Sequence, residues 1–306
     1  MPRSRDSDLH GFVVVDKAAG WSSHDAVARV RKLIGVRRVG HAGTLDPFAT
    51  GVLVLGVGKA TRLLQYIQGS TKVYQATIRL GEETDTLDPE GVIVSRKDVS
   101  AWPSADQVTR VIERFIGTIQ QVPPAHSAIH IEGKRAYDLA RAGQEFDLPT
   151  RTVTIDGITI RGYDPPRLDL EIVCHTGTYI RSLARDIGRE LQTYGYCTAL
   201  RRIAIGDFTI ENAVDVTRMN GQEIRERWEE FFLPPDRAVQ MYPRAEITGK
   251  QTVAWYHGQS LPDVPGTPDG DDHSLVRVYS ADGAFAGLGT FEEKHGLRPV
   301  LVFSTG

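Results

Sequence analysis

The sequence lacks the features of several common protein classes. Its 306 residues include two cysteines, Cys174 and Cys197, too few for the disulfide framework of a small secreted domain. No apolar run is long enough to cross a bilayer, and the first ten residues are too polar for a secretory signal peptide. We therefore expect a cytoplasmic protein that does not enter a membrane.

Motifs that bind cofactors are also missing. No combination of His, Cys, Asp and Glu has the spacing of a metal site, and no G-x-S-x-G elbow occurs. Gly58-Lys59 fails as a phosphate loop, because Ala60 follows the lysine and Leu53 stands where the first glycine belongs. We expect neither a metal ion nor a small-molecule cofactor.

The charge balance alone does not indicate a nucleic-acid-binding protein, since the net charge is −3. The distribution is more informative, because phosphates respond to local potential. Six cations and one acid lie in the segment 17–38; the cations are Lys17, Arg29, Arg31, Lys32, Arg37 and Arg38. A solvated helix face would explain them equally well. If the cluster does bind an RNA backbone, Arg37, Arg38 and the nearby Lys59 are the candidate contacts.

The most informative stretch is Gly40–Gly51, which reads GHAGTLDPFATG. Pro47 keeps Asp46 out of the helical region, and the three glycines permit conformations or close approaches that side chains forbid. The apolar run that follows, Val52–Leu55, predicts a buried strand. An isolated Asp-Pro is best explained as a turn. Here His41 and Asp46 share one loop, which favours a functional site.

This stretch resembles the catalytic motif of the TruB family, the tRNA pseudouridine-55 synthases, whose pattern G-H-x-G-x-L-D-P-x-A-x-G is matched at every fixed position. Further segments that resemble the family are Lys72-Val73-Tyr74, Gly177–Arg181 and the region of Leu200. The chain departs from the family pattern at three positions: Ala18, where proline is usual; His126, where tyrosine is usual; and His130, where lysine is usual.

The resemblance implies an enzyme that isomerises uridine 55, in the T loop of tRNA, to pseudouridine. It implies base flipping, an aspartate nucleophile, no cofactor, and a monomer whose partner is the T arm. Asp46 would be the catalytic carboxylate, and Arg181 could bind it bidentately through its permanently charged guanidinium. Without that context, Arg181 would be explained as a surface ion pair at a helix start.

Five other residues are supporting candidates for substrate binding. Tyr74 could stack on a flipped uracil and assist proton movement, or pack in the core of a strand. Tyr179 has the same ambiguity, and packing is favoured there. His41 could fill the gap left by the extruded base, or bond the local backbone. Leu200 could be a wall of the pocket or ordinary core, and Lys17 is the lysine of the family's Lys-Pro turn.

The resemblance also implies the fold class. We expect α+β architecture with the pseudouridine synthase fold: a mixed, largely antiparallel sheet flanked by helices in a catalytic domain of residues 11–240. A small PUA-like domain is expected over residues 243–306. The acidic segment Gly81–Gly91 is predicted to be a loop and receives no site role. An RNA-folding protein built on the same scaffold is the alternative function, with chemistry secondary to binding.

Overall fold

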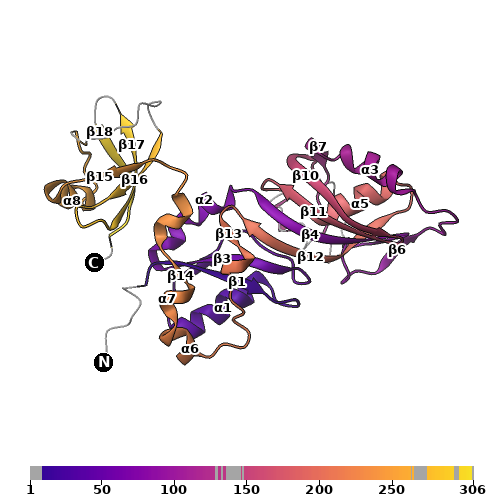
Figure 1. The fold of residues 1–306 in the computed structure, drawn as a ribbon, viewed down its shortest axis with the longest axis horizontal. Coiled ribbons are helices and arrows are strands. Elements are labelled where there is room, and N and C mark those ends of the chain that lie inside the picture. The colour runs from indigo at the N-terminus through magenta and orange to yellow at the C-terminus, as the bar shows by residue number, and fades with distance from the viewer. Residues whose placement is uncertain are drawn as a thin grey trace.

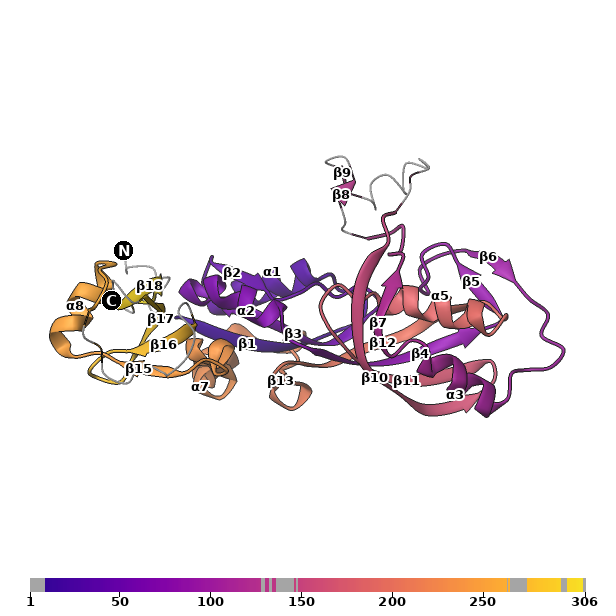
Figure 2. The same cartoon turned by 90° about the horizontal axis from the view of Figure 1, so that it is seen from above.

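The computed structural model describes residues 9–127, 130–131, 134–135, 146, 148–262, 264, 274–292 and 296–304. These residues form an elongated molecule with one large sheet and, at one end, a separate small sheet from the C-terminal part of the chain (Figures 1 and 2). The predicted α+β class, with a separate C-terminal sheet domain, is confirmed.

The large sheet has ten strands, whose main path runs β14-β1-β3-β12-β4-β11-β10-β7, with β2 paired to β3 and β13 paired to β12. Among the pairings of these named strands in the described residues, only β3–β12 is parallel, so the sheet is mixed and largely antiparallel, as predicted. The strands are β1 (Gly11–Lys17), β2 (Val39–His41), β3 (Thr50–Val57), β4 (Lys72–Leu80), β7 (Gly117–Gln121), β10 (Arg151–Asp164), β11 (Arg167–Cys174), β12 (Gly195–Ile205), β13 (Phe208–Thr209) and β14 (Phe232–Leu233).

The parallel contact places the loop between β2 and β3 at the middle of the sheet. Thr50 and Gly51, at the start of β3, lie opposite Arg201 and Arg202 of β12. Strand β12 in turn pairs with β4 along most of its length. The loop that contains Asp46 therefore ends where β3 meets β12, one strand away from β4.

The helices begin and end at residues suited to those positions. In α1 (Ser23–Ile34), Ser22 and Asp25 form a capping box, and Gly35 ends the helix with a left-handed φ of 73°. The other helical elements are η2 (Gly58–Leu63), α2 (Leu64–Gln68), α3 (Ala105–Glu113), α5 (Ile180–Glu190), η3 (Ile210–Asn212), α6 (Gly221–Glu226), α7 (Trp228–Phe231), η4 (Pro235–Val239) and α8 (Gly249–Tyr256), of which the η elements are 3-10 helices.

Strand β1 separates two hydrophobic layers, because successive side chains of a strand point to opposite faces. Val13 and Val15 pack in the same core as α1, and Phe12 and Val14 pack in the core that contains η2 and α2. Figure 1 shows α1 and α2 on opposite sides of β1 and β3. Farther along the sheet, α5 packs against β12 and β4 and contributes Leu183 to the first core.

Part of the acidic segment expected to be a loop is a strand. β5 (Glu82–Thr84) pairs with β6 (Ile93–Arg96), and the residues between them form turns. A second two-stranded pair consists of β8 (His130–Ile131) and β9 (Lys134–Arg135). The short β5–β6 hairpin brings residues 85–91 back toward α5, which matters for the site described below.

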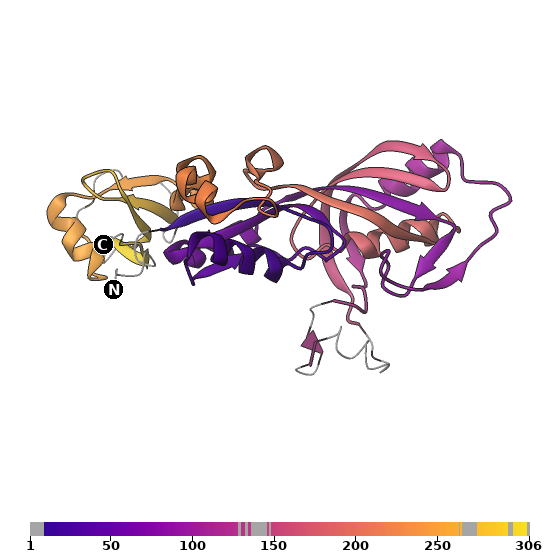
Figure 3. The ribbon, with the colours of Figure 1, turned by 90° about the horizontal axis from the view of Figure 1, so that it is seen from below.

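The C-terminal sheet has its own core, centred on the fully buried Trp255, whose indole N–H donates to the Ala286 carbonyl at 2.8 Å. It also packs on the large domain, because Phe285 and Leu301 share a core with Leu63. In Figure 3 this sheet and strands β10 and β11 lie at opposite ends of the molecule. Its elements, besides α8, are β15 (Arg244–Glu246), β16 (Leu275–Tyr279), β17 (Phe285–Glu292) and β18 (Gly296–Val302).

Candidate active site

The loop between β2 and β3 presents Asp46 in a conformation that depends on glycine. Gly43 and Gly51 have φ angles of 81° and 99°, in the left-handed region that side chains disfavour. A Cβ on Gly51 would lie 2.2 Å from the Arg202 carbonyl oxygen, so this position also needs glycine for its close approach to β12. The Ala49 amide donates to the Asp46 carbonyl at 3.1 Å and closes the turn around Pro47.

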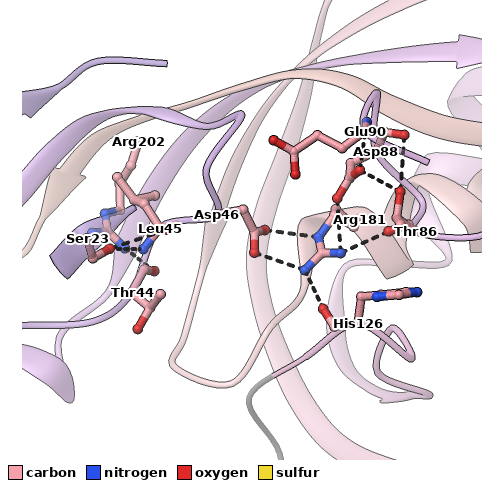
Figure 4. Close-up of polar contacts among 10 residues, drawn as sticks. All are labelled: Ser23, Thr44, Leu45, Asp46, Thr86, Asp88, Glu90, His126, Arg181 and Arg202. Atoms are coloured by element: carbon pink, nitrogen blue, oxygen red, sulfur yellow. Dashed lines mark hydrogen bonds and ion pairs between the residues drawn. The ribbon is translucent and has the colours of Figure 1, made fainter. Parts of the chain in front are cut away.

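Residues on both sides of Asp46 are held by buried polar groups. The Leu45 amide donates to the Ser23 hydroxyl at 2.9 Å (Figure 4). On the other side, the Lys17 ammonium donates to the Pro47, Trp21 and Ala18 carbonyls at 3.2, 2.6 and 3.0 Å. Burial lowers the pKa of Lys17 to about 8. Lys17 therefore lies beneath the loop as an anchor and does not line the cavity described below.

Changing Lys17 to methionine should destabilise the protein. The change removes the donor shared by three carbonyls, so we expect the free energy of unfolding to fall by about 2–4 kcal/mol. Urea denaturation followed by circular dichroism measures this. Lys32→Met, at an exposed position of α1, is the control and should change stability by less than about 0.5 kcal/mol. Equal effects of the two changes would show that Lys17 does not anchor the loop.

Asp46 and Arg181 form a bidentate ion pair. Arg181, in the first turn of α5, donates through Nε to Asp46 Oδ2 and through Nη2 to Asp46 Oδ1, each at 2.9 Å (Figure 4). The Arg181 side chain is 4% exposed, whereas that of Asp46 is 33% exposed. The guanidinium is thus buried behind the carboxylate, and the carboxylate remains open to a reactant.

A second carboxylate, Asp88, completes this arrangement and was not identified from the sequence. Asp88 Oδ2 lies 3.2 Å from Arg181 Nη1, which also donates to the Thr86 carbonyl at 2.8 Å. Asp88 itself accepts from the Thr86 hydroxyl at 2.5 Å and the Glu90 amide at 3.0 Å (Figure 4). Its side chain is 6% exposed. The acidic composition of the segment gave no signal that separated this residue from its neighbours.

The segment before β8 provides the last contact to Arg181. The His126 carbonyl accepts from Arg181 Nη2 at 3.0 Å, and His126 is one of the residues that line the cavity beside Asp46. The described residues therefore give the guanidinium two carboxylates and two carbonyls. This network fixes the direction from which Asp46 is approached.

A cavity of about 400 Å³ opens beside Asp46. Three of the predicted substrate-binding residues line it: Tyr74, Tyr179 and Leu200. Burial raises the pKa of both tyrosines. Tyr179 is held by Gln121, which accepts from its amide at 2.9 Å and donates to its carbonyl at 3.1 Å. The other lining residues are Gly43, Thr44, Leu45, Lys72, His126, Ser127, His175, Thr176, Gly177, Thr178, Ile180, Arg181 and Arg202.

A larger cleft of about 750 Å³ lies on the other face of β4, beside Gln75 and Thr77. Four of its charged side chains pair with one another: Arg161 with Glu171, and Arg167 with Asp169. No carboxylate in this cleft is held by a buried cation as Asp46 is. The smaller cavity is the better candidate for the site.

His41 lies outside the cavity lining, at the end of β2. Its ring makes an edge contact with His24, with ring centroids 5.6 Å apart. Its Nδ1 is buried and has no hydrogen-bond partner among the residues that the structure describes. Burial and the nearby His24 lower the pKa of His41. It is adjacent to the Asp46 loop without being part of the pocket.

The cations of segment 17–38 differ in their contacts and exposure. Arg29 donates to three carbonyls, those of Val216, Thr217 and Met219, and Arg31 donates to the Val39 carbonyl. Arg38 donates to the Thr61 hydroxyl and is exposed. The expected single cluster is therefore partly structural, since these backbone contacts occupy Arg29 and Arg31, and Lys17 is buried.

Lys59 lies in another part of the molecule from the cavity. Its ammonium donates to the backbone carbonyl and the hydroxyl of Ser304, so it connects the large domain to the end of the chain. The structure does not bring it to the site with Asp46. Residues 9–127 and the other described parts contain no group of three or more His, Cys, Asp or Glu residues able to hold a metal ion. No helix among them is long and apolar enough to span a bilayer.

Comparison with family models indicates the class of enzyme. Residues 31–180 match the model described as TruB family pseudouridylate synthase (N terminal domain), and residues 243–303 match the model described as Pseudouridine synthase II TruB, C-terminal. The two matches identify the chain as a pseudouridylate synthase.

Full-length relatives define the family. The tRNA pseudouridine synthase B of Thermobifida fusca is 42% identical over 96% of this chain and 98% of its own length, and that of Trichormus variabilis is 42% identical over 96% and 99%. The chain belongs to the TruB family. A solved Cbf5-Nop10-Gar1 complex contains a chain with a TM-score of 0.72 and 25% identity, covering 96% of this chain and 85% of that one. The predicted family is confirmed.

Proposed function

We propose that this protein converts uridine 55, in the T loop of tRNA, to pseudouridine, using Asp46 as the nucleophile and no cofactor. The observation that carries the proposal is the bidentate Asp46–Arg181 pair at the edge of an open cavity. Relatives of nearly equal length named tRNA pseudouridine synthase B support tRNA as the substrate. We expect the enzyme to act as a monomer in the cytoplasm.

The reaction suits a site of this composition. It breaks the bond between uracil N1 and ribose C1′, turns the base, and joins C1′ to C5, so no atom is gained or lost. A nucleophilic carboxylate beside the glycosidic bond divides a difficult substitution into two steps. Arg181 keeps the carboxylate in one orientation, because two parallel hydrogen bonds fix both oxygens. The partly exposed face of Asp46 is the one that would meet the ribose.

The cavity would hold the base after it leaves the RNA stack. A nucleotide modified at its base must be extruded, and aromatic side chains stack readily on such a base. Tyr74 and Tyr179 provide rings, and Leu200 provides an apolar wall. These roles of pocket residues follow from their position around the space beside Asp46.

The proposal is tested with purified protein and two short T-arm stem-loops. One has the natural sequence, and the other has cytidine in place of the uridine at position 55. Pseudouridine mapped by reverse-transcription stops after carbodiimide treatment should occur at position 55 of the first RNA and nowhere in the second. Modification at a different uridine, or none in either RNA, would contradict the proposed substrate.

His41→Ala should impair extrusion of the base more than the chemistry. His41 is next to the Asp46 loop but outside the cavity, which suits a side chain that fills the space left in the RNA. We expect turnover on folded tRNA to fall about tenfold, with a smaller loss on an unstructured RNA of the same loop sequence, where less unstacking is needed. Single-turnover rates on both RNAs measure this. Equal losses would indicate a chemical or purely structural role.

Changing Arg37 and Arg38 together to alanine should weaken tRNA binding and flatten its salt dependence. Both residues lie between α1 and β2, just before the Asp46 loop, and are exposed. If Arg37 and Arg38 each contact one phosphate in the unaltered protein, the double variant releases fewer counterions when it binds. The magnitude of the slope of log K against log salt should then decrease by about 1.4–1.8. Filter binding between about 50 and 200 mM salt measures the slope. An unchanged slope would show that these residues form a solvated surface.

A further inference from the structure

Two buried cations line the cavity beside Asp46. Lys72, the first residue of β4, is 6% exposed, and Arg202 of β12 is 1% exposed. Both belong to the cavity lining. Within the described part of the chain, neither residue forms an ion pair with a carboxylate. Because a buried charge normally has an anionic partner, this wall of the cavity has positive charge that the described residues do not balance.

Both cations donate to backbone carbonyls, which are dipoles without net charge. The acceptors are Gln68 and Ser70 for Lys72, at 2.5 and 2.7 Å, and Val52, Gly43 and Thr44 for Arg202, at 2.8, 3.1 and 3.4 Å. An ammonium has three N–H donors and a guanidinium has five, so these bonds do not use all the donors of either group. The carbonyls hold the two cations in place and leave each able to bind a further acceptor.

The strand register places both cations on the face of the sheet that carries Tyr74. Arg202 lies directly opposite Tyr74 in the β12–β4 pairing, and Lys72 precedes Tyr74 by two residues on β4, so the three side chains point to one face. Figure 4 shows Arg202 and Arg181 on opposite sides of Asp46. The space proposed for the extruded base is therefore bordered by cations other than the one that holds Asp46.

Both cations are charged near neutral pH. Burial lowers the pKa of Lys72 to about 8, which still leaves most of the ammonium protonated at pH 7. A guanidinium does not lose its proton in proteins. The nearby phenol of Tyr74 and thiol of Cys174 do not balance the charge, because burial raises the pKa of both and keeps them neutral.

We propose that Lys72 and Arg202 form a subsite that accepts the negative charge of the uracil when the base is detached from the ribose. This inference rests on the proposed isomerisation. An oxygen of Asp46 bonds to C1′ while the C1′–N1 bond breaks, and the electron pair of that bond stays with the ring, shared by N1, O2 and O4. The carboxylate becomes a neutral ester and the base becomes an anion. The total charge does not change, and no proton is transferred in this step.

This step moves a negative charge from one side of the site to the other. Arg181 pairs with Asp46 before the step and keeps Asp88 as a partner when the carboxylate becomes an ester. The base anion, in contrast, lies in the cavity lined by Lys72 and Arg202. Cations that are already in place stabilise such a developing charge without having to reorganise. Lys72 is the better residue to change, because its carbonyl partners lie outside the Asp46 loop, whereas Arg202 also holds that loop.

The test compares two T-arm stem-loops that have uridine or 5-fluorouridine at position 55. Fluorine withdraws electrons from the ring, so the detached fluorouracil is a weaker base and needs less stabilisation. With uridine, Lys72→Met should slow single-turnover consumption of the nucleoside about 10²-fold, as for the loss of one group that stabilises a developing anion. With 5-fluorouridine the loss should be at most about a third as large, because the better leaving group depends less on the cation. Affinity for both RNAs should be unchanged.

Other variants separate charge from packing. Lys72→Arg keeps the charge, so it should retain more activity than Lys72→Met and the same ratio of rates on the two RNAs as the unaltered enzyme. Arg202→Gln should show the same difference between substrates as Lys72→Met. Arg201→Gln is its matched control and should change neither rate, because Arg201 pairs with Asp16 and does not line this cavity. If Lys72→Met does not fold, Lys72→Gln, whose amide can still donate to a carbonyl, should give the same pattern.

Equal losses on the two RNAs would overturn the inference. Equal losses together with weaker RNA binding would show that the two cations bind a phosphate of the RNA backbone. Equal losses together with a lower melting temperature would show that Lys72 only supports β4. Failure of the proposed function gives a different result, since the unaltered enzyme would then form no pseudouridine at position 55 of the uridine RNA.

Discussion

Asp46→Asn is expected to abolish pseudouridine formation while the protein stays folded and binds tRNA. Asparagine nearly preserves the size of the side chain but removes the charge that the nucleophile needs. Arg181 keeps its contacts with Asp88, Thr86 and His126, so the site should not collapse. We expect a decrease of at least about 10⁴-fold in rate, as for the loss of a catalytic side chain in other enzymes. The measurement is product yield after long incubation with excess enzyme, together with tRNA affinity.

The control for this experiment is the unaltered enzyme with and without a chelator. Its yield should be the same in both, because the proposed chemistry uses Asp46 and no metal ion. Appreciable product from the folded asparagine variant would contradict the nucleophile assignment. Loss of product from the unaltered enzyme on chelation would contradict the metal-free mechanism. RNA folding measured with the same variant separates isomerisation from the alternative function, since an RNA-folding activity should survive the substitution.

Arg181→Lys is expected to have the second largest effect, a decrease in rate of about 10²–10³-fold. Lysine keeps the charge but cannot bond both Asp46 oxygens while also contacting Asp88 and two carbonyls. The carboxylate should therefore lose its fixed orientation, and misplacement of a reacting group by about 1 Å costs about 10²-fold. Single-turnover rates at saturating tRNA measure the loss without a contribution from binding.

Arg185→Lys, one helical turn farther along α5, is the matched control. Arg185 is also buried, but it contacts the Val122 carbonyl and Asp186 outside the network around Asp46. Its rate should stay within about threefold of the unaltered enzyme. If both lysine variants lose activity equally, the effect of Arg181→Lys reflects the stability of α5. Arg181→Met should also destabilise the protein, by about 3–5 kcal/mol, because it leaves the buried Asp88 unpaired.

The sequence contained enough information to locate the Asp46 loop because the signals there are local. A proline after the aspartate, glycines at the turns and an apolar strand all lie within twenty residues. The structure shows the physical reason for two of those glycines: Gly43 and Gly51 adopt left-handed φ angles, and Gly51 touches β12. Arg181 was identified through the family resemblance, and its ion pair with Asp46 is present in the structure.

Residues whose roles depend on distant contacts were not predictable in the same way. Asp88 belongs to an acidic segment with no distinguishing pattern, and its importance comes from the β5–β6 hairpin that returns it to α5. In the sequence, Arg201 and Arg202 are two adjacent arginines that nothing distinguishes. The structure shows that Arg202 lies opposite Tyr74 in the β12–β4 pairing, whereas Arg201 pairs with Asp16. Counting charges along the sequence also overestimated the number of cations that could bind an RNA backbone, because Arg29 and Arg31 donate to backbone carbonyls of the protein.

The most direct test of the central claim is to map pseudouridine in tRNA from cells that lack this protein. The account predicts that pseudouridine is missing at position 55 of the T loop and unchanged elsewhere in the tRNA. Expression of the unaltered protein should restore it, and expression of the Asp46→Asn variant should not. Pseudouridine that persists at position 55 in cells without the protein, or that returns with the asparagine variant, would contradict the account.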